Sequence, residues 1–395
     1  MVTILKKINR LIRKIWARIA GLAPVIRMFR DPVWSKTRYP GEELKSRPRI
    51  LLENIFWLLR HGEVNRFYWL YGFDRADGPG HSEYMPYTRF KKIRNQRNRI
   101  AGIGGYYSDY TVILKDKFVF SLVLSSLGFS TPKVAGVCMN GRINWLDTET
   151  ETGLEGLKNL EDINYFCKTL LGECADGVCH LTGGAGSLLC DGRAVDISEL
   201  QRMTSGSFLL QERVEQHPEM SRLYPCSINT IRLVTVMTGG APQLFAASIR
   251  TGASGSTRDN WAVGGLSGGI DIETGKLSPI FDFKPGYGGR ADRHPDTGVI
   301  FGEFTVPMFD QAKKEALELH SYLYGLHSIG WDMAISPDGP VFIEGNDNWE
   351  ITPHQVVEGG LRRRFLEAAG LAAADKAAAD SPPGVKPAAP VCSSV

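Results

Sequence analysis

Residues 341–351 read VFIEGNDNWEI, an apolar strand that ends in a series of oxygen-bearing side chains. Just upstream, residues 330–340 read GWDMAISPDGP, a second strand followed by an Asp-Gly pair, which is the strongest short-range signal for a hairpin turn. Alternation along a strand places every second side chain on the same face. Pairing across the turn therefore predicts a hairpin that brings three side chains together: Asp332, Glu344 and Asn346.

This trio suits Mg²⁺, because that ion prefers one or two carboxylates together with substrate phosphate oxygens to a cage made only of protein. The alternative is an acidic loop that does no more than cap a hairpin. The hairpin residues alone do not decide between the two interpretations.

The composition is that of an ordinary soluble protein. With 395 residues, 43% of them hydrophobic and 23% charged, the chain is long enough for more than one hydrophobic core, and its net charge of +3 predicts no particular partner. The seven cysteines are an odd and scattered set, which indicates a reducing, cytoplasmic compartment. Cys174 and Cys179 lack the second pair or the spaced His of a zinc site.

Residues 1–20 read MVTILKKINRLIRKIWARIA and form an amphipathic helix when plotted at about 100° per residue. No apolar run reaches the roughly 18 to 20 residues needed to span a bilayer, and the charges interrupt any secretory signal. The helix either lies on an anionic membrane surface, with Trp16 in the interface, or packs on its own protein with a solvated basic face. Its apolar side holds Ile4, Leu5, Ile8, Leu11, Ile12, Ile15, Trp16 and Ile19, and its basic side Lys6, Lys7, Arg10, Arg13, Lys14 and Arg18.

The sequence after this helix changes character twice. Residues 31–108 are helical and aromatic, and the basic run TRFKKIRNQRNR at 88–99 has no nucleic-acid motif beside it, so we expect a solvated helix face and no nucleic-acid partner. From residue 111, repeated Asn-Gly, Asp-Gly and Gly-Gly turns with interspersed helices predict antiparallel sheets in an α+β architecture. A low-complexity tail follows Leu371, and we expect it to be disordered.

Two lysines are candidates for holding phosphates. Lys117 opens a helix, and Lys168 ends a strand before a small, glycine-bearing loop at 169–177 that contains Gly172 and Gly177. Backbone N–H groups of such a loop can cover a phosphate chain while the lysine adds a point charge. Either lysine taken alone could equally be solvated.

A possible adenine hinge lies in SFLLQERVEQHPEM at 207–220. The apolar strand breaks at Gln211, Glu212 and Val214, which can offer backbone groups to an adenine edge, and Glu219 supplies a carboxylate for ribose hydroxyls. An edge strand turning into a loop explains these residues equally well.

The order of these elements resembles the ATP-grasp superfamily. Four segments, LLQERVEQHPE, SINTIRLVTV, NWAVGGLSGGIDIETG and GWDMAISPDGPVFIEGN, more closely resemble the sugar-transfer associated ATP-grasp family, which is similar to α-L-glutamate ligases and is found with polysaccharide biosynthesis enzymes. The resemblance covers residues 85–368. It implies two antiparallel-sheet subdomains that sandwich ATP, preceded here by a mainly helical region.

The resemblance also implies roles for individual residues. Lys117 and Lys168 become phosphate ligands, with the loop at 169–177 as phosphate cover. Gln211, Glu212 and Val214 become hinge positions and Glu219 the ribose acid. The implied Mg²⁺ ligands are Asp332, Glu344 and Asn346.

Two features depart from the family pattern. The loop TLLGECADG has fewer glycines than many relatives have, and Gly330 stands where an arginine often precedes the first metal-binding aspartate by two positions. The positive charge needed beside an acyl phosphate must then come from Arg232, Arg250 or Arg290, with Arg232 first because an unpaired charge in its strand would be costly. The glycine-rich ASGSTRDNWAVGGLSGG at 253–269 is either a close-approach substrate loop or a plain mobile loop.

These observations predict an ATP- and Mg²⁺-dependent ligase that joins a small-molecule carboxylate to an amine or hydroxyl acceptor. A hydroxyl kinase on the same fold and a non-catalytic, membrane-associated module remain alternatives. The expected regions are a basic helix at 1–30, a helical region at 31–108, a lid subdomain at 109–207, a metal-binding subdomain at 208–368 and a tail at 369–395.

Overall fold

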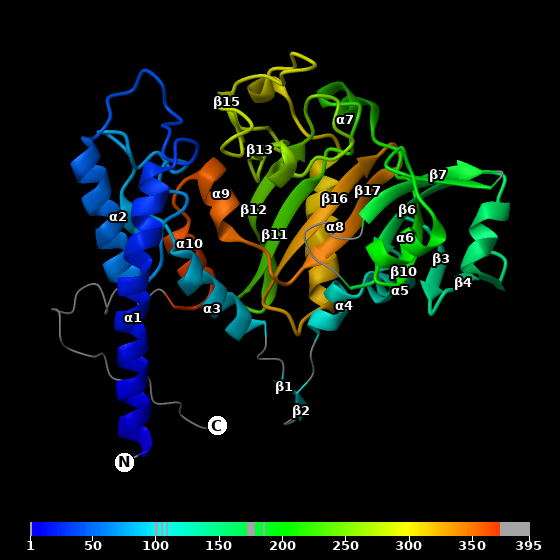
Figure 1. The fold of residues 1–395 in the computed structure, drawn as a ribbon, viewed down its shortest axis with the longest axis horizontal. Coiled ribbons are helices and arrows are strands. Elements are labelled where there is room, and N and C mark those ends of the chain that lie inside the picture. Colours follow the sequence, from blue (N-terminus) through cyan, green and yellow to red (C-terminus); the bar gives the residue numbers. More distant parts are fainter. Residues whose placement is uncertain are drawn as a thin grey trace.

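The computed structural model describes residues 2–98, 102–103, 106–107, 110–171, 178–184 and 186–371. In this part of the chain, a helical N-terminal region precedes two larger antiparallel sheets (Figure 1). The predicted α+β class with two antiparallel subdomains is therefore confirmed. Gly172, Gly177 and nearly all of the predicted tail lie outside the described residues.

The N-terminal region is built on two packed helices, α1 (Val2–Arg30) and α2 (Arg47–His61). Gly21 allows their close approach, because a Cβ atom there would lie 2.5 Å from Leu58 Cδ1. Aromatic side chains form a core of their own beside these helices: Trp57, Tyr68, Trp69, Tyr71, Phe73 and Tyr84. The remaining elements are η1 (His81–Glu83), α3 (Tyr87–Arg97), β1 (Gly102–Ile103) and β2 (Tyr106–Tyr107).

An eight-stranded sheet follows, with the order β5-β4-β3-β10-β6-β7-β8-β9. β10 pairs with both β3 and β6, so the chain leaves this sheet only after Glu212. The predicted subdomain boundary at 207/208 falls just before β10. The strands are β3 (Val134–Met139), β4 (Arg142–Trp145), β5 (Thr150–Gly153), β6 (Ile163–Thr169), β7 (Val178–Gly184), β8 (Ser187–Cys190), β9 (Arg193–Ala194) and β10 (Phe208–Glu212). The helices are α4 (Thr111–Lys115), α5 (Lys117–Ser126), η2 (Leu154–Asn159) and α6 (Ile197–Met203).

The second large sheet has seven strands, in the order β15-β14-β13-β12-β11-β16-β17. Its strands are β11 (Ile231–Thr238), β12 (Ala241–Thr251), β13 (Leu266–Gly269), β14 (Phe281–Phe283), β15 (Arg290–Ala291), β16 (Ser328–Ser336) and β17 (Gly339–Asn346). Its helices are α7 (Pro218–Leu223), η3 (Trp261–Val263), η4 (Phe301–Glu303), α8 (Phe309–Tyr322), α9 (Ile351–Glu358) and α10 (Arg362–Ala368).

The two faces of the seven-stranded sheet differ in polarity. One face carries apolar side chains such as Ile231 and Trp331, which share a core with Ala316 of α8. Directly opposed residues in an antiparallel ladder share a face, so the register places a row of polar side chains on the other face. This row contains Glu344, Asp332, Arg232, Ser248, Arg250, Ser267, Asp282 and Arg290.

The regions around the two sheets contact each other through loops and helices. Phe342 N–H donates to Ser130 O at 2.9 Å, and a Cβ atom at Gly345 would lie 2.7 Å from Leu114 Cδ2. On the other side, Arg258 pairs with Asp191 in the turn between β8 and β9 at 2.5 Å.

Candidate active site

The hairpin of β16 and β17 brings the two predicted metal-binding carboxylates together. Asp332 and Glu344 are directly opposed in the register, and Asn346 is opposed to Gly330. Asn346 Nδ2 lies 3.3 Å from Glu344 Oε1 and 3.4 Å from Gly330 O, so its amide oxygen remains available as a ligand. The Asp-Gly turn and the alternation of the strands thus produce the cluster that the sequence predicts.

Two of the three candidate arginines converge on Asp332. Arg232 Nε and Nη2 donate to the two carboxylate oxygens, and Arg250 Nη2 lies 3.2 Å from Oδ2. Only 2% of the Asp332 side chain is exposed. Burial opposes ionisation of this carboxyl, but Arg232 and Arg250 outweigh that effect and hold the pKa of Asp332 well below its usual range.

Glu344 titrates differently from its neighbour. Burial raises the pKa of Glu344, the adjacent Asp332 carboxylate raises it further, and Arg232 and Arg250 only partly offset this. Two carboxyl groups at one site favour a single negative charge until a cation compensates the second. The two carboxyl groups therefore differ in their tendency to ionise, with the pKa of Asp332 lowered and that of Glu344 raised.

Both predicted phosphate lysines lie near this carboxylate pair. Burial lowers the pKa of Lys168 to about 8, Glu344 raises it, and Lys117 lowers it. Lys168 therefore lies within electrostatic range of both Lys117 and the Glu344 carboxylate. The backbone connects them as well, because Lys117 N–H donates to Leu170 O at 3.1 Å and joins the start of α5 to the end of β6.

The hinge residues lie where the chain leaves the eight-stranded sheet. Gln211 is buried, and its Oε1 has no hydrogen-bond partner among the described residues, while Nε2 lies 3.5 Å from Pro132 O. Glu212 is exposed and its carboxylate pairs with Lys133 at 3.0 Å. Val214 is half-buried in the loop that follows. The buried acceptor on Gln211 fits a site that receives a donor such as an adenine amino group.

Two predicted residues are not drawn into the cluster. Glu219 lies on α7 and pairs with Arg222 at 2.6 Å, and both side chains are about half exposed or more. Arg290 lies on the edge strand β15, where it faces Asp282 at 3.7 Å and stacks on Tyr39 at 4.5 Å. Because four strands separate β15 from β16, Arg290 belongs to the far end of the polar row.

Asp259 is a site residue that the sequence analysis did not single out. Its carboxylate accepts hydrogen bonds from the N–H and the hydroxyl of Thr230 and lies 3.9 Å from Arg250. Arg250 also donates to Thr230 Oγ1 at 3.0 Å. In the sequence Asp259 is marked only as the single acid inside the glycine-rich segment at 253–269. No local pattern identifies it as a partner of Arg250 and Thr230.

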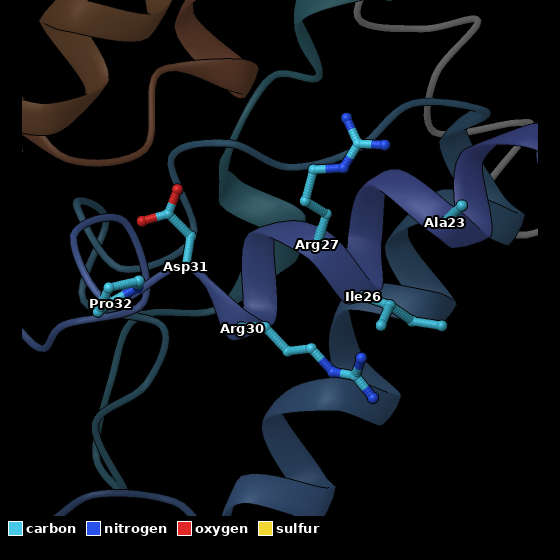
Figure 2. A pocket seen from close by; sticks show the side chains of 6 residues that line it. All are labelled: Ala23, Ile26, Arg27, Arg30, Asp31 and Pro32. Atoms are coloured by element: carbon cyan, nitrogen blue, oxygen red, sulfur yellow. The ribbon is translucent and has the colours of Figure 1, made fainter.

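Two further observations limit what the site can hold. Among the described residues, no group of three or more His, Cys, Asp or Glu side chains is arranged to bind a metal ion by itself. A separate depression at the end of α1 contains none of the predicted site residues (Figure 2). It is lined by Ala23, Ile26, Arg27, Arg30, Asp31 and Pro32.

Because the described side chains do not complete a metal site by themselves, a cation at the hairpin needs ligands beyond its two carboxylates. The amide of Asn346 and oxygens of a bound molecule could supply them.

The chain is similar to several solved structures. One is a D-alanine–D-alanine ligase from Helicobacter pylori, with 10% identity, a TM-score of 0.37, and coverage of 66% of this chain and 61% of that one. Another is an N5-carboxyaminoimidazole ribonucleotide synthetase from Thermotoga maritima, with 14% identity, a TM-score of 0.32, and coverage of 67% and 49%. The chain spans less than two thirds of the length of these structures.

A family model gives the assignment. No curated protein sequence matches the chain significantly. The model of the family described as sugar-transfer associated ATP-grasp matches residues 104–369, which is more than half of the chain and includes both larger sheets. The chain therefore belongs to the sugar-transfer associated ATP-grasp family.

Proposed function

We propose that the protein activates a small-molecule carboxylate with ATP and Mg²⁺, through an acyl phosphate, and then joins it to an amine or hydroxyl acceptor. The observation that carries this proposal is the packing of α5, which begins at Lys117, against both the end of β6, which carries Lys168, and β17, which carries Glu344. Cations for a phosphate chain and acids for its metal ion are thereby placed beside each other. The family's association with sugar transfer supports a role in cell-surface polysaccharide or amino-acid conjugate biosynthesis.

The residues around the hairpin fit Mg²⁺ bound together with nucleotide. Asp332 and Glu344 provide two carboxylates and Asn346 an amide oxygen, which is a hard-oxygen set of the size that Mg²⁺ takes when phosphates complete its coordination. When bound, the ion neutralises charge on the β- and γ-phosphates. A bound cation would favour the ionised form of Glu344, whose pKa is raised by burial and by the adjacent Asp332.

The chain's own residues act by position and charge. Lys117 and Lys168 hold the phosphates from the side of the eight-stranded sheet, and Gln211, Glu212 and Val214 line the adenine hinge. Arg250 and Arg232 border the carboxylate pair and lie next to one another in the polar row. They stabilise the charge that develops on the acyl phosphate, because preorganised cations in a site shielded from water lower the barrier strongly. Arg290 is too far along the row for this role and instead stabilises the sheet edge.

An assay of phosphate fate tests the proposal. Purified protein is incubated with ATP, Mg²⁺ and pools of candidate carboxylates and amines or alcohols, and products are identified by mass spectrometry. Ligation yields ADP, free phosphate and a condensed product. A phosphorylated acceptor without free phosphate would instead identify a hydroxyl kinase, and no turnover with any pool while ATP still binds would identify a non-catalytic nucleotide-binding module.

We further propose that α1 holds the enzyme on an anionic membrane surface. The described part of α1 exposes a row of large apolar side chains directed away from Gly21, the residue that faces α2: Ile8, Ile12, Ile15, Trp16, Ile19, Leu22 and Ile26. Residues 1–30 contain eight Lys or Arg and no Asp or Glu. No helix of the described chain is long and apolar enough to cross a bilayer. An exposed apolar row flanked by cations fits a helix that lies in the membrane interface.

A further inference from the structure

Four buried cysteines gather in the core of the eight-stranded sheet, and the proposed reaction uses none of them. Cys138, Cys167, Cys179 and Cys190 are all free and at most 4% exposed. They come from β3, β6, β7 and β8, and all four belong to one hydrophobic cluster. No metal-binding group of three or more His, Cys, Asp or Glu side chains exists in the described chain, so this cluster is not arranged as a zinc site.

Cys167 and Cys179 have a special relation within the cluster. They are directly opposed in the register of β6 and β7, one pair before Lys168 and Val178. Opposed residues of an antiparallel ladder have Cα atoms about 4.5 to 5.5 Å apart, within the range that a disulfide spans. Cys190, by contrast, is opposed to Leu181. The Cys167–Cys179 pair therefore lies at the root of the segment that joins the two strands.

The surroundings lower the pKa of the Cys179 thiol and raise the pKa of the Cys167 and Cys190 thiols. Burial raises the pKa of Cys167 well above its usual range and that of Cys190 to about 12. A hydrogen bond from the Cys167 thiol lowers the pKa of Cys179 to about 7, burial opposes this, and Cys190 and the Arg258 guanidinium reinforce it. Arg258 lies between β12 and β13 of the seven-stranded sheet, and its ion pair with Asp191 holds it near Cys179. A lowered pKa and a nearby cation favour the reactive thiolate, whereas the burial of Cys179, which is 2% exposed, slows the approach of an oxidant.

We propose that Cys167 and Cys179 form a redox-active dithiol whose disulfide displaces the neighbouring Lys168 and weakens nucleotide binding. The second half of this statement rests on the proposed function, because it takes Lys168, the neighbour of Cys167, as a phosphate ligand. The disulfide draws the two sulfur atoms to about 2.05 Å. This contraction acts on the strand pair that carries Lys168, and the backbone position of the lysine changes with it.

The chemistry requires a small-molecule disulfide as oxidant. The Cys179 thiolate attacks one sulfur of this disulfide and expels a thiolate, which leaves a mixed disulfide on Cys179. The Cys167 thiol then loses its proton, attacks the Cys179 sulfur and expels the second thiolate. Two protein thiols thus lose two electrons and two protons, and the oxidant gains both.

Peptide mapping tests the site without assuming any nucleotide chemistry. Folded protein carrying Cys174→Ser is treated with hydroxyethyl disulfide, quenched with acid, alkylated and digested with trypsin. Cleavage after Lys158, Lys168 and Arg193 separates Cys167 in peptide 159–168 from Cys179 and Cys190 in peptide 169–193. We expect these two peptides to be cross-linked, and Cys179→Ser to abolish the cross-link. Cys138→Ser, a buried thiol of the same core, should retain it.

Titration with a non-hydrolysable ATP analogue tests the coupling. We expect the oxidised protein to bind the analogue about fivefold or more weakly than the reduced protein, and saturating analogue to shift the oxidation equilibrium by the same factor. A 179–190 loop within one peptide, or reaction confined to the exposed Cys226, would overturn the assignment. Equal or tighter binding after cross-linking would overturn the coupling. If the reduced protein does not bind the analogue, the nucleotide site fails while the peptide map still decides the dithiol.

Discussion

Glu344 is the residue on which the metal assignment depends most directly. Substituting Glu344→Gln removes one ligand charge without changing the volume of the side chain. Losing one preorganised contact to the transition state typically costs about 3 kcal/mol, so we expect kcat to fall by about 100-fold or more. Steady-state kinetics at saturating ATP and Mg²⁺ measure the effect. Glu318→Gln, on the exposed side of α8, is the matched control. Turnover near the wild-type rate would refute the role of Glu344.

Lys168 predicts a pH dependence of nucleotide binding. Its pKa of about 8 lies below the usual value for lysine, so the ammonium is charged below this pH and neutral above it. Affinity for an ATP analogue should therefore fall as the pH rises through this value, by up to about tenfold per unit. Calorimetric titration across this range measures the dissociation constant.

Two variants at Lys168 separate charge from shape. Lys168→Arg keeps its charge throughout, so its affinity should not show this fall. Lys168→Ala should bind weakly at every pH while its melting temperature stays close to that of the wild type. A wild-type dissociation constant that does not change with pH would mean that Lys168 does not bind the phosphates. An unchanged dissociation constant in Lys168→Ala would mean the same.

At the scale of elements, ion pairs join parts of the chain that are distant in sequence. Arg38, in the segment between α1 and α2, is 7% exposed and donates to Phe283 O and Gly289 O at 2.7 Å and to Asp282 at 3.2 Å. Arg258 and Asp191 join the two sheets, but their side chains are 47% and 37% exposed. The buried pair should matter far more to stability than the exposed one.

Denaturant unfolding distinguishes the two pairs. Arg38→Ala leaves Asp282 and several carbonyl groups without a partner, so it should lower the free energy of unfolding by about 3 kcal/mol or more. Asp191→Asn removes an exposed pair and should cost less than about 1 kcal/mol. Midpoints measured for both variants in urea check the contrast. Equal losses would contradict the view that Arg38 anchors the N-terminal region to the sheet edge.

At the scale of the whole molecule, α1 consists of a docked part and a projecting part. Arg18 Nε donates to Leu59 O at 2.7 Å, Gly21 faces Leu58, and Val25 is fully buried. The N-terminal part of the helix extends past the end of α2 (Figure 1). The docked part thus starts near Arg18, and the residues before it are the ones left for a membrane.

A truncation tests the membrane proposal. Deleting residues 1–17 should abolish flotation with liposomes that contain anionic lipid and leave the melting temperature unchanged, because the docked part remains. The five cations before Arg18, each worth about 1 kcal/mol near such a surface, should also make binding salt-sensitive, since screening shortens to about 3 Å at 1 M salt. Neutral liposomes provide the control. Equal flotation of both proteins, together with a lowered melting temperature of the truncated one, would make the helix a part of the fold only.

Local patterns in the sequence determined several of the elements and the hairpin that carries the two carboxylates. Turn chemistry and period-two alternation act over a few residues, so the Asp-Gly pair and the strands beside it were enough to predict that Asp332 and Glu344 lie together. The same holds for α1, whose two-sided character follows from the helical period. The family followed from motifs arranged in order along the chain, and the family match confirms it.

Contacts between distant parts of the chain were decided only by the tertiary structure. Arg232 and Asp332 are 100 residues apart, and nothing local distinguished Arg232 and Arg250 from Arg290 as partners of that acid. The order of strands across the sheet made the choice, because it put β11 and β12 near β16 and put β15 at the far edge. Asp259 and the opposed pair of Cys167 and Cys179 depend on the same kind of information. Strand order and register follow from which apolar faces pack together, and that is a property of the assembled core rather than of any one segment.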